Sequence, residues 1–239
     1  MAFWFLLAVP IVVIGALIRY RLRINALSTW KIDATTPDII RAVIRRDNLN
    51  LVALLSSGSN PDIIWNGSEA FRTYVCDETL GLTPLMLAAQ MGSVGMVRAL
   101  VEGGAIIDFT NGYGDTALHH ANIVEVVEIL IEAGADVNRL SRLGDPPLVS
   151  TAASGDAAIA SALIRAGADI NIQSSEGDSP LIEAAWAGNY EVVELLIRYG
   201  ADPALRNKEG LTALQVAKSK HRRRCVEALT QYEKKMAPR

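Results

Sequence analysis

The feature that most restricts the fold of this 239-residue chain is a sequence period of about 33 residues. One glycine series has successive gaps of 33, 30, 33 and 33 positions: Gly81, Gly114, Gly144, Gly177 and Gly210. A second series in the same phase has gaps of 30, 33 and 33: Gly104, Gly134, Gly167 and Gly200. A fixed period of this length is typical of stacked repeats, because each unit buries its apolar face only against its neighbours.

Local signals predict two helices in each unit. Thr83-Pro84 suits a helix start for two reasons. The threonine hydroxyl can cap exposed N–H groups, and proline is tolerated at the first helical position because the backbone N–H there has no helical partner. A helix of small residues follows, then a glycine turn, then a Val/Leu/Ile-rich helix such as 191–197. The glycine after each second helix supplies a left-handed stop.

These segments resemble the ankyrin repeat. Gly81-Leu82-Thr83-Pro84-Leu85 matches the first half of that unit, and Gly134-Ala135-Asp136-Val137-Asn138 matches its second half. The resemblance covers about residues 35–235 and implies an all-α solenoid of six helix-turn-helix units with β-turn fingers. Residues 37–62 are a diverged first repeat, and residues 205–235 are a C-terminal cap. In this cap, basic residues replace apolar or small ones: Lys218, Lys220, Arg222, Arg223 and Arg224.

The first 23 residues are expected to form a membrane anchor. The segment from Ala2 to Ile18 is apolar and carries no charge, and Arg19, Arg21 and Arg23 follow it. As a helix it spans roughly 25 Å, slightly less than the roughly 30 Å hydrocarbon core. The arginines follow the run without a good cleavage site, which favours an uncleaved anchor over a cleaved signal peptide or a buried helix. They also predict that the repeats, joined by a linker at 24–34, lie on the cytoplasmic side.

Two departures from the period could carry function. An insertion between Gly58 and Gly81 includes Trp65, Phe71 and Tyr74, which are either interface anchors or packed back onto the first repeats. The repeat that begins at Thr116 is three residues short, nearly one helical turn, so its first helix should be short. The deletion either notches the inner surface or has no functional meaning.

No motif points to catalysis, a cofactor or a metal. His119 falls at the histidine of the family's Thr-Pro-Leu-His start, where the resemblance implies hydrogen bonds to the turn. No carboxylate or thiol has ligand spacing with His119 and His120. The chain has no Gly-rich phosphate loop, no Gly-x-Ser-x-Gly elbow and no Cys-x-x-Cys pair. We therefore expect no enzyme activity, no cofactor and no small-molecule substrate.

Charge is unevenly distributed along the chain. Residues 1–46 hold 7 basic and 2 acidic side chains, residues 47–204 hold 6 and 21, and residues 205–239 hold 10 and 3. The acidic middle either steers a basic protein partner to the concave face or reflects exposed glutamates on outer helices. It disfavours nucleic acid, which needs a basic stripe. The basic C-terminus either keeps the end of the stack soluble or contacts anionic lipid.

The resemblance also implies a binding surface. In ankyrin proteins the finger tips and the first helices line the concave side. The matching positions here are Leu80, Leu82, Gln90, Met91, Tyr113, Asp115, Arg142, Asp145, Glu176, Asp178 and Trp186. Trp186 stands out because it lies among alanines, and tryptophan is enriched at binding hot spots; the alternative is burial against the next repeat.

The expected function is therefore a membrane-tethered module that binds a protein partner through its concave face and fingers. One alternative is an inhibitor or immunity-type protein that blocks an enzyme, with the aromatic insertion as its plug. Another is an exported ankyrin protein, which a different membrane topology would require.

Overall fold

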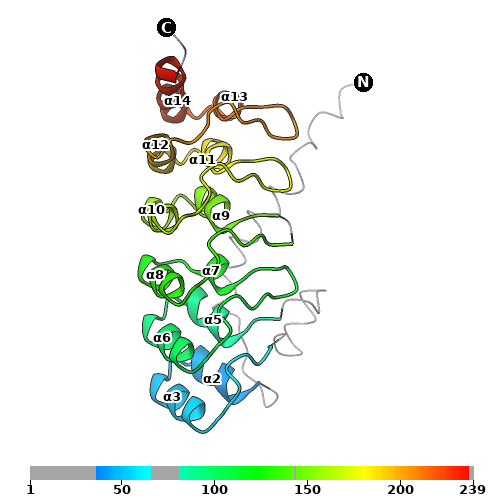
Figure 1. Cartoon of the computed structure of the whole chain (residues 1–239), viewed down its shortest axis with the longest axis vertical. Coiled ribbons are helices and arrows are strands. Elements are labelled where there is room, and N and C mark those ends of the chain that lie inside the picture. Colours follow the sequence, from blue (N-terminus) through cyan, green and yellow to red (C-terminus); the bar gives the residue numbers. More distant parts are fainter. Residues whose placement is uncertain (1–35, 66–80, 143, 237–239) are drawn as a thin grey trace.

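A computed structural model describes residues 36–65, 81–142 and 144–236 as a single stack of helix pairs (Figure 1). In each pair the first helix lies on the inner side, next to the turns that form the fingers, and the second lies on the outer side. The pairs are α2 (Asp38–Ile44) and α3 (Asn48–Ser56), α5 (Pro84–Gln90) and α6 (Val94–Glu102), α7 (Ala117–His120) and α8 (Val124–Glu132), α9 (Pro147–Ser154) and α10 (Ala157–Arg165), α11 (Pro180–Ala187) and α12 (Tyr190–Arg198), and α13 (Ala213–Ser219) and α14 (Arg223–Met236). The all-helical repeat architecture that the sequence predicts is confirmed.

The expected membrane anchor at residues 1–23 and the linker at 24–34 lie outside the described residues. Among the helices that the structure describes, none combines the length and apolar character needed to cross a bilayer.

Side-chain caps begin the inner helices α5, α11 and α13, and the cap of α5 by Thr83 is the one that the sequence predicts. The Thr83 Oγ1 accepts a hydrogen bond from the N–H of Met86 at 3.3 Å, and the Ser179 Oγ accepts one from Ile182 at 3.3 Å. These bonds satisfy N–H groups that have no partner within the helix. Gly188 ends α11 in the left-handed conformation, with φ of 85°.

The hydrophobic core runs the length of the stack, between the inner and the outer helices. Inner helices pack on inner helices, as α11 does on α9 and α13, and outer helices pack on outer helices, as α12 does on α10 and α14. Leu100, Leu130 and Leu196 are fully buried, one in each of three outer helices. Each pair thus completes the core of the next, which is why the units are stable only as a stack.

Hydrogen bonds between fingers fix the spacing of the repeats. The Asn138 Oδ1 accepts from the N–H of Asp169 at 2.8 Å, and the Asn171 Oδ1 accepts from that of Asp202 at 2.8 Å. The equivalent position in the last repeat is Ala204, whose side chain cannot form such a bond. The asparagine of the Gly-Ala-Asp-x-Asn pattern therefore links one finger to the next. The last described finger has no following finger to bind, and it has alanine in place of this asparagine.

The turn glycines at the finger tips allow adjacent fingers to approach closely. A Cβ on Gly114 would lie 2.6 Å from the backbone nitrogen of Arg142, and one on Gly177 would lie 3.0 Å from that of Lys208. A Cβ on Gly210, in the last finger, would meet nothing within 4 Å. Internal fingers thus require glycine both for its positive φ and for space, whereas the terminal finger requires it only for φ.

The inner helix of the third repeat is shortened, which confirms the prediction from the three-residue deletion. Helix α7 has 4 residues, against 8 in α9 and α11. The N–H of Thr116 donates to the His119 Nδ1 at 3.1 Å, and the His119 Nε2 lies 3.2 Å from the carbonyl oxygen of Asp145. His119 therefore has the structural role that the resemblance implies: it caps α7 and joins it to the next finger.

Candidate functional site

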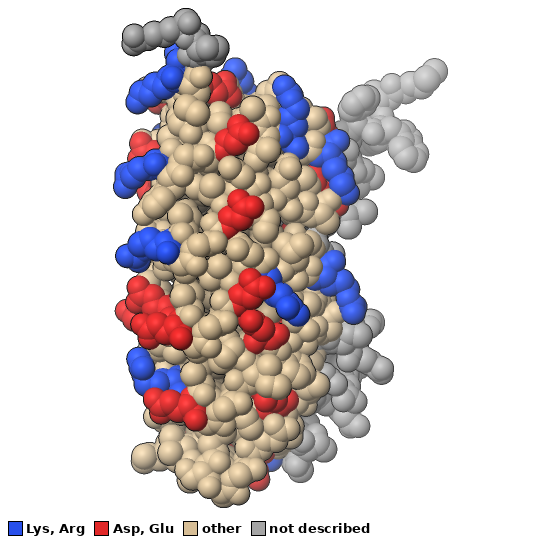
Figure 2. All heavy atoms as spheres, viewed as in Figure 1, with Lys and Arg blue, Asp and Glu red and all other residues tan. Residues whose placement is uncertain are grey.

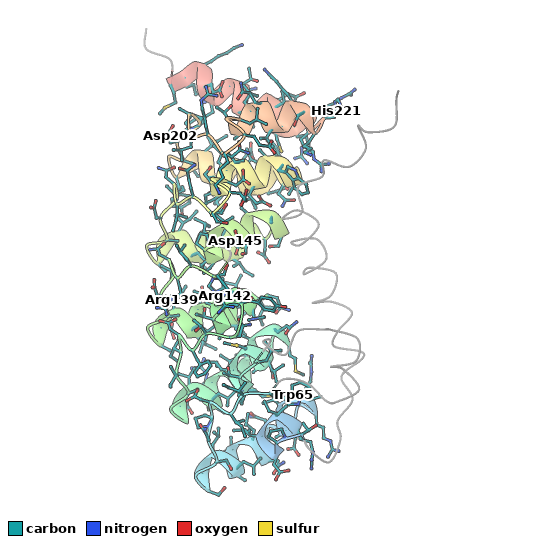
Figure 3. All side chains as sticks on the ribbon, turned by 90° about the vertical axis from the view of Figure 1, so that its right-hand side faces the viewer. Trp65, Arg139, Arg142, Asp145, Asp202 and His221 are labelled. Carbon is teal, nitrogen blue, oxygen red and sulfur yellow. The ribbon has the colours of Figure 1, made fainter. Side chains whose placement is uncertain are left out.

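A groove on the concave side of the last three repeats is the candidate site. It has a volume of about 220 Å³ and lies between the fingers at 174–178 and 207–211 and the helices α9, α11 and α13. Its apolar lining comes from Val149, Ile182, Leu211 and Val216, among others. Its acidic lining comes from Asp145, Glu176, Asp178, Glu183 and Glu209. In the view from the finger side, Asp145 lies between Trp65, toward the N-terminal end, and His221, near the C-terminal end (Figure 3).

The groove carboxylates differ in whether a hydrogen-bond donor or a cation lies beside them. The Asn207 Nδ2 donates to the Asp178 Oδ1 at 3.0 Å, and the Lys208 Nζ lies 3.8 Å from the Glu176 Oε1. Within the described part of the chain, the Glu183 carboxylate has neither a hydrogen-bond donor nor a cation as its partner. Glu183 therefore brings an uncompensated acid to a groove that two neighbouring carboxylates already make negative.

This environment favours the protonated form of Glu183. Its pKa is raised from 4.5 to about 7, first by burial and then by the negative charges of Asp178 and Asp145. Burial also raises the pKa of Asp178, and the hydrogen bond from Asn207 partly opposes that change. A cation placed beside Glu183 would reverse the effect and favour the ionised carboxylate.

An aromatic wall with a cation on it borders the groove. The Lys220 Nζ lies 5.4 Å from the centre of the Trp186 ring, within the range of a cation–π interaction. The Arg222 Nε donates to the carbonyl oxygen of Trp186 at 3.2 Å, which holds the end of α11 against the cap. Trp186 is half-buried, so it packs against the neighbouring repeat and still lines the groove.

The structure brings together four of the residues that the sequence proposed for binding: Asp145, Glu176, Asp178 and Trp186. It places the others in different surroundings along the stack. Gln90 is buried at the end of α5, and its carbonyl oxygen accepts a hydrogen bond from the Asn122 Nδ2 at 2.8 Å. Met91, which follows it, is half-buried.

The remaining proposed positions near the third repeat belong to its fingers. The N–H of Arg142 donates to the carbonyl oxygen of Tyr113 at 2.7 Å, so these two tip residues touch through their backbones. The Arg142 side chain is exposed. Asp115 is buried, with its Oδ2 3.8 Å from the His120 Nε2. The carboxylate of Asp115 therefore faces the inside of the third repeat in this structure.

The insertion residues have different outcomes. Trp65 is 7% exposed, and its backbone pairs with that of Leu82 through two hydrogen bonds of 2.9 and 3.0 Å. The Trp65 side chain is part of the hydrophobic core, which is the arrangement that the packing alternative expects. Phe71, Tyr74 and Leu80 lie outside the described residues.

Glu183 is one of several groove residues that the sequence analysis does not single out, and it is the one with the most perturbed environment. An alignment of the repeats finds it, because the fourth position of the inner helix holds no acid in α5, α7, α9 or α13, where the residues are Leu87, His120, Ser150 and Val216. A glutamate at a position that is mostly apolar or small is the signal. Lys220 was placed in the basic cap, but its contact with Trp186 depends on how two repeats stack and has no sequence signature.

The fold and the groove define a helical repeat protein with cavities on the surface of its stack. The family model described as ankyrin repeats (3 copies) matches residues 39–141 and 143–238. The chain therefore belongs to the ankyrin repeat family.

Curated relatives agree with this family over part of the chain. SH3 and multiple ankyrin repeat domains protein 1 from Homo sapiens is 43% identical over 83 residues, which are 33% of this chain and 4% of that protein. Neurogenic locus notch homolog protein 1 from Xenopus tropicalis is 30% identical over 100 residues, 41% of this chain and 4% of that protein. The chain thus matches only a small fraction of each relative's length.

Proposed function

We propose that this chain is a non-catalytic protein-interaction module that holds a basic protein partner on its concave face and fingers. The observation that carries the proposal is the groove of the last three repeats, where an acidic lining surrounds an apolar floor and an aromatic wall. Ankyrin repeats are protein-interaction modules in general, and this groove offers a partner both charge and apolar area.

Site-specific photo-crosslinking tests this function. A photoreactive amino acid replaces Ser150, which lines the groove, or Glu125, which is exposed on the outer helix α8. We expect one protein to be captured from Ser150 and not from Glu125, with a yield that falls as salt is raised, because charge steers the encounter. Equal capture from both positions, or yield independent of salt, would contradict the proposal.

We further propose that residues 1–23 tether the module to a membrane by a single pass, with the repeats on the cytoplasmic side. The support is the uncharged apolar run at 2–18 and the three arginines that follow it. A reporter that is active on only one side of the membrane, fused after Arg239, tests the topology. A cytoplasmic signal supports the tether, and a signal on the far side would indicate an exported protein.

A further inference from the structure

The fold does not require a carboxylate at position 183. The equivalent positions in α5, α7, α9 and α13 hold Leu87, His120, Ser150 and Val216, none of which is an acid, and each of these packs in the same stack. A glutamate on the solvent-facing side of an outer helix would need no ligand to explain it. Glu183 instead lies on an inner helix and lines the groove. An acid in this place lowers the stability of the stack, because burial opposes its charge.

The charges around Glu183 come from every element that faces the groove. The preceding finger contributes Asp145, and the finger before α11 contributes Glu176 and Asp178. The finger before α13 contributes Lys208 and Glu209, and the end of α13 contributes Lys220. Lys208 is engaged by Glu176, so the groove has more negative charge than its own lysines offset.

A cation already occupies the aromatic wall of this groove. Lys220 is exposed, and its ammonium lies over the Trp186 ring. This contact is an internal example of the interaction that a partner's cation would make, on the same wall of the same cavity. Because an exposed cation–π contact of this kind is weak, a ligand can displace the lysine from the ring.

We infer that the groove binds one cationic side chain, arginine in preference to lysine, which a basic segment of the partner inserts between Glu183 and Trp186. This inference rests on the proposed function, since it names what the interaction module recognises. Arginine fits best because its planar guanidinium can stack on the indole while its N–H groups donate to carboxylates, whereas an ammonium acts as a point charge. The apolar floor at Ile182 and Val216 would hold the methylene stem.

Short synthetic peptides test the inference on the full chain. The probes are a Gly/Ser peptide with one central arginine and the same peptide with lysine or with citrulline, which is neutral and nearly isosteric with arginine. Binding is followed by NMR through the indole N–H of Trp186 and the backbone amide of Glu183. We expect saturable shifts at both sites with arginine, weaker binding with lysine, and at least tenfold weaker binding with citrulline.

Three variants locate the site. Glu183→Gln should weaken arginine binding at least tenfold, Lys220→Gln should strengthen it severalfold by removing the competing cation, and Glu125→Gln on α8 should leave it unchanged. Circular dichroism checks that each variant is folded. Calorimetry at pH 7 in two buffers of different ionisation enthalpy should show proton release on binding, because the cation favours ionised Glu183.

Equal affinity for arginine and citrulline, shifts confined to other repeats, or full binding by Glu183→Gln would overturn the inference. Those results leave the interaction module intact if the crosslink from Ser150 persists in Glu183→Gln. If the protein with the photoreactive residue at 150 and an otherwise unchanged groove captures no partner, the proposed function itself is contradicted. The two failures are therefore distinguishable.

Discussion

The third and fifth repeats place an ionisable residue at the same position of the inner helix, next to the equivalent aspartate of the finger. In the third repeat this residue can attract the aspartate, and in the fifth repeat it repels it. In the third repeat, the fourth residue of α7 is His120, and it faces the buried carboxylate of Asp115 at 3.8 Å. In the fifth repeat, the fourth residue of α11 is Glu183, and it senses the negative charge of Asp178. The two aspartates are themselves equivalent, because each follows the turn glycine of its finger.

This difference shows how one repeat frame supports a buried contact in one place and an open groove in another. The His120 and Asp115 side chains are 7% and 9% exposed, so their pairing joins a shortened helix to its finger and closes that part of the surface. Glu183 and Asp178 cannot pair in that way, and the groove beside them is open to a ligand. The space-filling view shows acidic side chains distributed along the stack and several basic ones near its C-terminal end (Figure 2).

The largest effect is expected from copying the fifth repeat into the third. His120→Glu would bury a second carboxylate beside Asp115, which should lower the free energy of unfolding by about 3–5 kcal/mol at pH 8. The loss should shrink toward pH 4 as the carboxyl groups protonate. Urea denaturation at both pH values measures it. Unchanged stability at pH 8 would show that the comparison between the two pairs is wrong.

The finger frame that both repeats share can be tested with a matched pair of glycines. Gly114→Ala should lower the free energy of unfolding by roughly 2–4 kcal/mol, because it combines a positive φ with a backbone clash. Gly210→Ala, with a similar φ and open space, should lower it by about 1 kcal/mol. Thermal melts of the two variants give the difference. If both lose the same stability, close finger approach does not constrain the internal repeats.

Removing the charge of the fifth repeat should stabilise the fold, in a pH-dependent way. The pKa of Glu183 is about 7 in the folded chain and near 4.5 unfolded, so the native state holds this proton more tightly. Wild-type stability should therefore fall as pH rises from about 4.5 through 7. Glu183→Gln lacks this loss and should gain about 1 kcal/mol at pH 8 and nothing at pH 4. At about 1.4 kcal/mol per pKa unit the upper limit of this gain is about 3–4 kcal/mol, and solvent screening in the open groove reduces it.

Denaturation of Glu183→Gln beside Glu125→Gln checks this sign. The control removes an exposed glutamate from α8 and should change stability by less than about 0.5 kcal/mol at either pH. A destabilised Glu183→Gln at pH 8 would mean that the carboxylate is held by the fold and is not available to a ligand.

The smallest effect is expected at the aromatic wall. Lys220→Gln removes the cation from the Trp186 ring and should change the free energy of unfolding by no more than about 1 kcal/mol. The stack should keep its structure, because Trp186 is also held through its carbonyl oxygen by Arg222. A loss well beyond the range of an exposed cation–π contact would assign Lys220 to the core of the cap and not to a displaceable contact.

Much of this architecture could be predicted because its determinants are local and recur. The capping residues Thr83 and Ser179 and the stop at Gly188 act within a few positions of themselves, so each helix is encoded in its own segment. The short α7 followed directly from a three-residue deletion. Trp65 was harder, because its burial depends on pairing with Leu82, which lies 17 positions later.

The sequence by itself determined the number of repeats, the start and end of their helices and the acidic character of the middle of the chain. Only the tertiary structure decided which acids meet. Asp145, Asp178 and Glu183 come from different segments and act on one another because stacking brings two fingers and an inner helix to one groove. Charge interactions depend on distance and burial, which a residue's place in the sequence does not specify. The period thus sets the frame, and packing between repeats sets the chemistry of the groove.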